Sequence, residues 1–145
     1  MRYNGSVGNK WVAQRTEAAR VQQDRLQARK NAEHEKAEAI IQQQWPIIRQ
    51  RGPAPVKLEV QGYGGVGRAR TNLTGWYLRK NKTVALGTDG KFYVLIAPLS
   101  TMDRIRGLKP QPTRPPLIIG EGGKDGETID LKDALERVYN PGKFV

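Results

Sequence analysis

The glycine-rich segment 62–67 has the spacing G-x-G-x-x-G, with which nucleotide-binding loops bring backbone amides close to a pyrophosphate. That chemistry needs a helix to begin directly after the last glycine. Residues 68–75 are instead rich in Thr, Asn and Gly and lead into a strand pattern, so no dinucleotide site is expected. The segment fits two other interpretations: an ordinary mobile hairpin, or a loop that approaches the phosphates of a polymer, since Arg68 and Arg70 follow it.

Further candidate residues lie on strand patterns at 76–79, 83–86 and 92–97, in which successive side chains point to opposite faces. Turn patterns at 80–82 and 88–90 join them into a meander. The face expected to be the core carries Trp76, Leu78, Val84, Leu86, Phe92, Val94 and Ile96. The opposite face carries two aromatic rings among cations, namely Tyr77, Arg79, Lys91 and Tyr93, with Lys80 and Lys82 at the hairpin tip.

Two alternatives stay open for that second face. If it is open, the tyrosine rings stack on bases and the cations contact phosphates, as in the recognition of single strands and loops. If the C-terminal helix covers it, with Leu131, Leu135 and Val138 on Tyr93 and Leu95, the basic surface is reduced to the hairpin tip and the loops. The basic track would continue along the chain through Arg104, Arg106, Lys109 and Arg114.

Charge supports a polyanionic partner. The 145 residues include 25 Lys and Arg against 14 Asp and Glu, for a net charge of +11. Residues 51–115 alone hold 12 basic and 3 acidic residues, a net charge of +9, which attracts polyanions. The chain has no Cys and one His, which excludes disulfides, Cys-based zinc sites and Cys nucleophiles. We expect no enzyme activity, no cofactor, no metal and no small-molecule substrate.

The elements that position these residues fall into two unlike parts. Residues 10–45 are rich in helix formers and lack Gly and Pro up to Pro46, which predicts one long helix that ends near residue 45. Residues 1–9 are expected to be a flexible tail and residues 46–55 a Pro/Gly linker. Residues 56–145 predict a small basic domain built on the meander. In it, Ser100 or Thr101 caps a short helix through residue 106, and Asp130 caps a C-terminal helix. The fold class is therefore α+β.

The long helix carries about one apolar residue per heptad, which is too sparse for a two-stranded zipper. Its basic face fits an acidic groove or a nucleic-acid backbone, and its alternative role is that of a solvated helix with local ion pairs. A denser apolar set near its end is expected to pack on the globular domain or on a second copy. This set is Leu26, Ile40, Ile41, Trp45, Ile47 and Ile48.

Three weaker signals are interpreted as structural. His34 is expected to be exposed on the helix. Glu121, Asp125 and Glu127 lack the spacing of a calcium loop and predict a surface turn. The segment 112–115 matches PxxP but needs no partner if it is a rigid spacer.

These patterns predict a non-enzymatic nucleic-acid-binding protein that contacts phosphates through its basic domain. The alternative is a structural or assembly component of a large complex that binds acidic protein surfaces. No apolar run is long enough to cross a membrane and the start does not resemble a secretory signal, so we expect a cytoplasmic location or an assembly formed there. The expected contact residues are Arg68, Arg70, Tyr77, Arg79, Lys80, Lys82, Lys91, Tyr93, Arg104 and Arg106.

Overall fold

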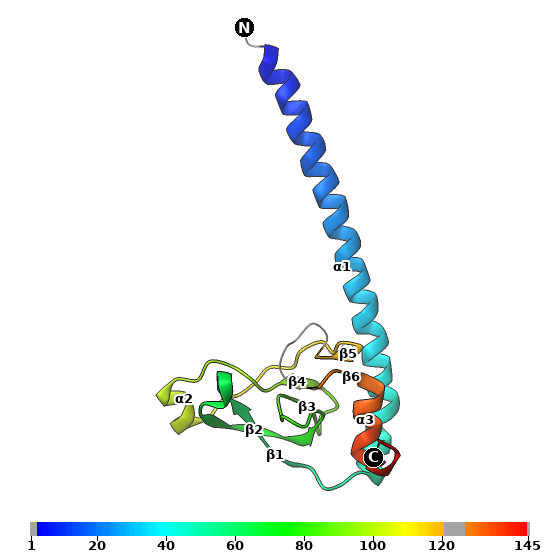
Figure 1. The fold of residues 1–145 in the computed structure, drawn as a ribbon, viewed down its shortest axis with the longest axis vertical. Coiled ribbons are helices and arrows are strands. Elements are labelled where there is room, and N and C mark those ends of the chain that lie inside the picture. Colours follow the sequence, from blue (N-terminus) through cyan, green and yellow to red (C-terminus); the bar gives the residue numbers. More distant parts are fainter. Residues whose placement is uncertain (1–2, 121–126, 145) are drawn as a thin grey trace.

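The computed structural model describes residues 3–120 and 127–144, with side chains from Asn9 onward. A long N-terminal helix is followed by a four-stranded antiparallel sheet and a C-terminal helix, so the predicted α+β class is confirmed (Figure 1). The helices and main strands in chain order are α1 (Tyr3–Arg51), β1 (Val56–Gln61), β2 (Arg68–Tyr77), β3 (Val84–Gly87), β4 (Phe92–Val94), α2 (Thr101–Arg106) and α3 (Leu131–Tyr139). The shorter elements are the 3-10 turns η1 (Tyr63–Gly65) and η2 (Pro141–Phe144) and the strand pair β5 (Ile118–Ile119) and β6 (Ile129–Asp130).

Helix α1 is a single rod whose lower part lies against the globular domain and whose upper part stands clear of it (Figure 1). It is already helical at Tyr3, within the expected tail at 1–9, of which residues 1–2 lie outside the described part. The side chains of residues 9–30 are all exposed. The upper half of α1 is therefore held by local interactions such as the ion pair between Glu17 and Arg20.

The predicted end of the helix near residue 45 was wrong, because α1 continues through Pro46 to Arg51. A proline inside a helix lacks one N–H and costs about 3 kcal/mol or more. Continuation beyond it buries Ile48 completely, and burying such a side chain stabilises the fold by about 1.5–3 kcal/mol. One turn earlier, the buried Gln44 accepts a hydrogen bond of 2.6 Å from the hydroxyl of Tyr139. Tertiary contacts on both sides of the proline thus offset its local cost.

The sheet has the order β1-β2-β3-β4, and β2 begins at Arg68, well before the strand expected at 76–79. The sheet curls until its two ends meet. The amide of Gln61 in β1 donates to the carbonyl of Leu95 at 2.9 Å, and the amide of Ala97 donates to the carbonyl of Gln61 at 3.0 Å. This closure encloses the inner face of the sheet.

The outer face of the curled sheet packs on α1 and α3. The core there comprises Ala37, Ile41, Ile48, Trp76, Leu78, Val84, Leu86, Phe92, Ile119, Leu131, Ala134 and Leu135. The inner face forms a second core of Leu58, Val60, Ala85, Tyr93 and Leu95. The C-terminal helix therefore covers the Trp76 face and not the Tyr93 face, contrary to one of the expected arrangements. Val94, expected in the core, is 41% exposed.

The proline-rich segment 109–116, which we call the strap, forms no helix or strand, and its C-terminal end lies against α1. The Nδ1 of His34 donates to the carbonyl of Pro115 at 2.8 Å, and Arg114 forms an ion pair of 2.6 Å with Glu38. His34 is half-buried, so its predicted exposure was wrong: the strap, more than 80 residues away in sequence, covers it. Among the described residues, no helix combines the length and the apolar character needed to cross a membrane.

Candidate nucleic-acid interface

The two tyrosines predicted to stack on bases do not form an open platform. Tyr93 is 3% exposed and donates its hydroxyl hydrogen to Asp89. Burial and the neighbouring Asp89 carboxylate raise the pKa of Tyr93 to about 12. Tyr77 is half-buried, its hydroxyl accepts a hydrogen bond from the amide of Glu59, and Lys82 lies 5.6 Å from its ring centre. Both rings pack in or against the inner core of the curled sheet, so neither is part of the candidate interface.

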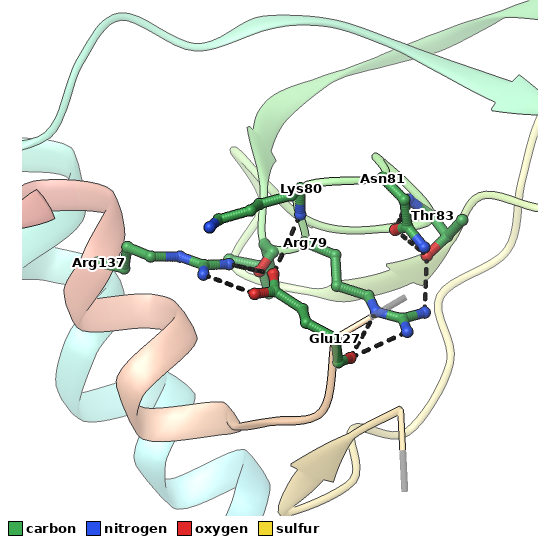
Figure 2. A network of polar contacts seen from close by, with 7 residues as sticks. Arg79, Lys80, Asn81, Thr83, Glu127 and Arg137 are labelled. Atoms are coloured by element: carbon green, nitrogen blue, oxygen red, sulfur yellow. Dashed lines mark hydrogen bonds and ion pairs between the residues drawn. The ribbon is translucent and has the colours of Figure 1, made fainter. Parts of the chain in front are cut away.

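Arg79 belongs to an internal polar network (Figure 2). Its guanidinium donates to the carbonyl of Glu127 at 2.9 and 3.1 Å and to the hydroxyl of Thr83 at 3.1 Å. Glu127 in turn binds Arg137 of α3, with 2.7 Å between Oε1 and Nη2, and accepts from the amide of Lys80 at 3.2 Å. Arg79 is therefore a structural residue in this fold and is removed from the predicted phosphate contacts.

The predicted surface turn was wrong for Glu127, whose side chain is 26% exposed, while Glu121 and Asp125 lie outside the described residues. Hydrogen bonds from Arg137 lower the pKa of Glu127 to about 2, against the opposing effect of burial. Since the folded pKa lies below the ordinary value of 4.5, ionised Glu127 stabilises the fold above pH 4.5. That stability is lost as the pH falls towards 2.

We expect Glu127→Gln to lower the free energy of unfolding by about 2–3 kcal/mol at pH 7, because Arg137 loses its carboxylate partner. Urea unfolding between pH 7 and pH 2.5 measures this difference, which should shrink below pH 4.5 because the Glu127 carboxylate of the unfolded wild-type chain then takes up protons while that of the folded chain stays ionised. Glu35→Gln, on the exposed face of α1, is the matched control and should change stability little. A Glu127→Gln variant as stable as the wild type would contradict a structural role for this network.

The remaining predicted lysines lie in separate turns. Lys80 and Lys82 are exposed in the turn between β2 and β3. Lys91, between β3 and β4, lines a different pocket beside α1, together with Glu38 and Arg114. The structure therefore does not assemble all the predicted cations into one surface.

Four of the predicted arginines do come together, at the side of the domain that carries α2 and lies away from α1 (Figure 1). They are Arg68, Arg70, Arg104 and Arg106. Arg70 links the two segments, because its guanidinium donates to the carbonyl of Ile105 at 3.2 Å and its carbonyl accepts from the amide of Leu108 at 2.7 Å. Arg104 lies directly over Gly67, at which a β-carbon would come within 2.5 Å of the guanidinium. The glycine at position 67 therefore leaves room for the Arg104 side chain, and a strand, not a nucleotide-binding helix, follows the loop.

Gly107 lets the end of α2 approach β2 this closely. Its φ is +85°, a conformation that residues with a side chain rarely adopt. A β-carbon there would lie 2.8 Å from the carbonyl oxygen of Arg70. A capping box between Ser100 and Asp103 fixes the other end of α2, so the arginines of this helix are held on a defined support.

An open groove of about 1010 Å³ runs beside these arginines; we call it the basic groove. Its walls come from three chain segments, at 57–59, 70–74 and 106–109. The charged residues that line it are Lys57, Glu59, Arg70, Arg106 and Lys109. Four cations against one carboxylate give a lining that suits a polyanion.

The excess of positive charge extends around the groove. Residues 56–74 and 98–109 contain six basic residues and two acidic ones, Glu59 and Asp103, for a net charge of +4. Arg68 approaches Glu59 only to 3.9 Å, with both side chains exposed, so this pair is weak. Asp103 is engaged in the capping box. Most of the positive charge is thus left facing solvent.

The apolar end of α1 packs on the globular domain. Ile41 and Ile48 are buried in the outer core, and Ile40 and Trp45 pack against it. Ile47 is half-buried, whereas Leu26 is 45% exposed on the upper half of α1. Of the two expected partners for this cluster, the domain of the same chain is the one seen here.

In comparisons with known proteins, neither a family model nor a curated protein nor a solved structure matches the chain.

Proposed function

We propose that this chain is a non-enzymatic, cytoplasmic nucleic-acid-binding protein that contacts phosphates through the basic groove and the arginines beside it. The observation that carries the proposal is that cations from three distant segments line one groove, with Glu59 as the carboxylate in its lining. The proposed contact residues are Lys57, Arg68, Arg70, Arg104, Arg106 and Lys109.

The exposure of these side chains supports the proposal. Lys57, Arg106 and Lys109 are exposed and, within the described part of the chain, form no ion pair. Arginine presents a planar fork of donors that matches phosphate oxygens. The binding of such a groove to phosphates releases counterions, so its affinity should fall steeply with salt.

Replacing Lys57, Arg106 and Lys109 together with Gln tests the groove without breaking an internal contact. For a single strand, each phosphate neutralised contributes roughly 0.7 decade of affinity per decade of salt, so the slope should flatten by about 2. Near 0.1 M salt this corresponds to about 100-fold weaker binding. Fluorescence anisotropy of a labelled oligonucleotide, titrated at several salt concentrations, measures both quantities.

The matched control removes the same charge elsewhere on the exposed surface, through Lys36→Gln, Arg51→Gln and Lys132→Gln. Its affinity and salt slope should stay close to those of the wild type. Equal losses in the two triple variants would show that net charge, and not the groove, determines binding. Failure of the wild type to bind any oligonucleotide at low salt would refute the proposal.

A second candidate is an assembly protein that binds acidic protein surfaces, and the upper half of α1 favours it. Trp11 and Val12 are 61% and 62% exposed there, and Arg15 lies 5.5 Å from the ring centre of Trp11. The state of the purified protein distinguishes the two functions. A high absorbance ratio at 260 and 280 nm that nuclease or high salt removes supports the nucleic-acid function.

A further inference from the structure

We infer that the ligand of the basic groove is a single-stranded nucleic acid, whose unpaired bases contact the floor of the groove while its phosphates meet the cationic rims. This inference rests on the proposed function and specifies its ligand. It is carried by the floor of the groove, by an irregularity in the β1–β2 pairing and by an exposed aromatic ring near Arg104.

The floor of the groove is apolar. The accessible apolar surface there comes from Leu73 and Leu108, which are half-buried and pack on the inner core with Leu58, itself 1% exposed. Bases offer flat, weakly polar faces that pack well on such a surface, whereas a duplex keeps its bases stacked and presents phosphates on its outside. Cations on the walls with leucines between them therefore match a strand whose bases turn inward.

A bulge in β2 shapes this floor. Lys57 pairs with Thr74 and Glu59 pairs with Arg70, so one residue of β1 faces three residues of β2. The hydroxyl of Thr71 stabilises the bulge, because it donates to the carbonyl of Leu58 at 2.6 Å and accepts from the amide of Leu73 at 3.1 Å. Bulges commonly redirect a side chain beside a functional site.

The residue at the centre of the bulge is Asn72. Asn72 is exposed and lines the groove, and its side-chain carboxamide has no hydrogen-bond partner among the described residues. A carboxamide offers two donor hydrogens and an acceptor oxygen on one plane, which complements the edge of a base. In a single strand the Watson–Crick edges are available to such a group, whereas in a duplex they are already paired.

Tyr63 adds an aromatic ring to the same end of the domain. It is 62% exposed in η1, within the glycine loop that reaches Arg104 at Gly67. An exposed aromatic ring beside cations is typical of surfaces that bind single strands. Unlike Tyr93, this tyrosine has its ring in solvent.

The test compares a single strand of 12 nucleotides with a 12-base-pair duplex of the same sequence by anisotropy competition. We expect the full chain to bind the single strand about tenfold more tightly at equal salt. Asn72→Ala and Tyr63→Ala should each weaken single-strand binding by about tenfold and leave duplex binding unchanged. Gln50→Ala, which removes an exposed amide from α1, is the matched control and should change neither.

The outcomes separate the inference from the function on which it rests. Equal affinity for the two ligands, with no effect of Asn72→Ala or Tyr63→Ala, would leave a phosphate-binding groove and overturn single-strand recognition. Absence of binding to both ligands would overturn the proposed function itself. Circular dichroism of each variant shows whether a loss of affinity reflects loss of the fold.

Discussion

Gly75→Ala is expected to unfold the sheet domain. Gly75 lies within β2, where it pairs with Val56 of β1 on one side and Gly87 of β3 on the other. A β-carbon on it would lie 2.1 Å from the carbonyl oxygen of Leu86 and 2.8 Å from the α-carbon of Gly87. These are backbone atoms of a paired strand, so no rotation of a side chain relieves the clash, and β2 and β3 must separate.

We expect the free energy of unfolding to fall by more than about 4 kcal/mol. This loss is larger than that caused by most single substitutions and is a large part of the total stability of a typical domain. Circular dichroism and urea unfolding measure it. Gly142→Ala is the matched control, since nothing lies within 4 Å of a β-carbon there, and its effect should stay within about 0.5 kcal/mol. A Gly75→Ala variant with the unfolding midpoint of the wild type would show that β2 and β3 are not packed this closely.

Ile48→Ala should destabilise the protein by about 2–5 kcal/mol. Ile48 is fully buried in the outer core, which joins α1, α3 and the sheet. Truncation leaves a cavity in a position that the helix reaches only because it continues through Pro46. Denaturant unfolding followed by tryptophan fluorescence measures the loss.

The neighbouring Ile47 provides the control for this prediction. It is half-buried and lies outside the outer core, so Ile47→Ala should cost about 1 kcal/mol or less. If the helix ended at Pro46, the two isoleucines would not differ in this way. Equal losses from the two substitutions would therefore contradict the continuation of α1 into the core.

Local patterns predicted the elements well where local chemistry determines them. The Asp-Gly turn at 88–90, the helix capped by Ser100 and the final helix after Asp130 all occur at the expected positions. The turn and the Ser100 cap depend on residues within a few positions of one another. Asp130 occupies the N-cap position of α3, but its side chain does not form the predicted capping hydrogen bond. The end of α1 escaped prediction because distant residues of α3 and the sheet bury Ile48 and stabilise a helix that contains a proline.

The candidate site shows the same limit. Alternation along a strand separates two faces but does not reveal what covers each face, so the sequence left open whether the face of Tyr93 is exposed, and in the structure Tyr93 belongs to the inner core. Arg79 is bonded by Glu127, 48 residues later in the chain, which strand periodicity does not indicate. Lys57 was missed, although alternation with Leu58 places it on the outer face of β1. The bulge at Asn72 depends on pairing register and has no simple signature in the sequence.

The exposed upper half of α1 has a thermodynamic consequence. From residue 9 to residue 30 it has no buried side chain whose packing would be lost on unwinding, so its helicity follows a helix–coil equilibrium of its own. On warming, this half should fray from its N-terminal end, while the half that packs on α3 and contacts the strap should stay helical. A molecule that binds the upper half while it is helical would bind a segment that is already ordered. The loss of conformational entropy of α1 on binding would therefore be small.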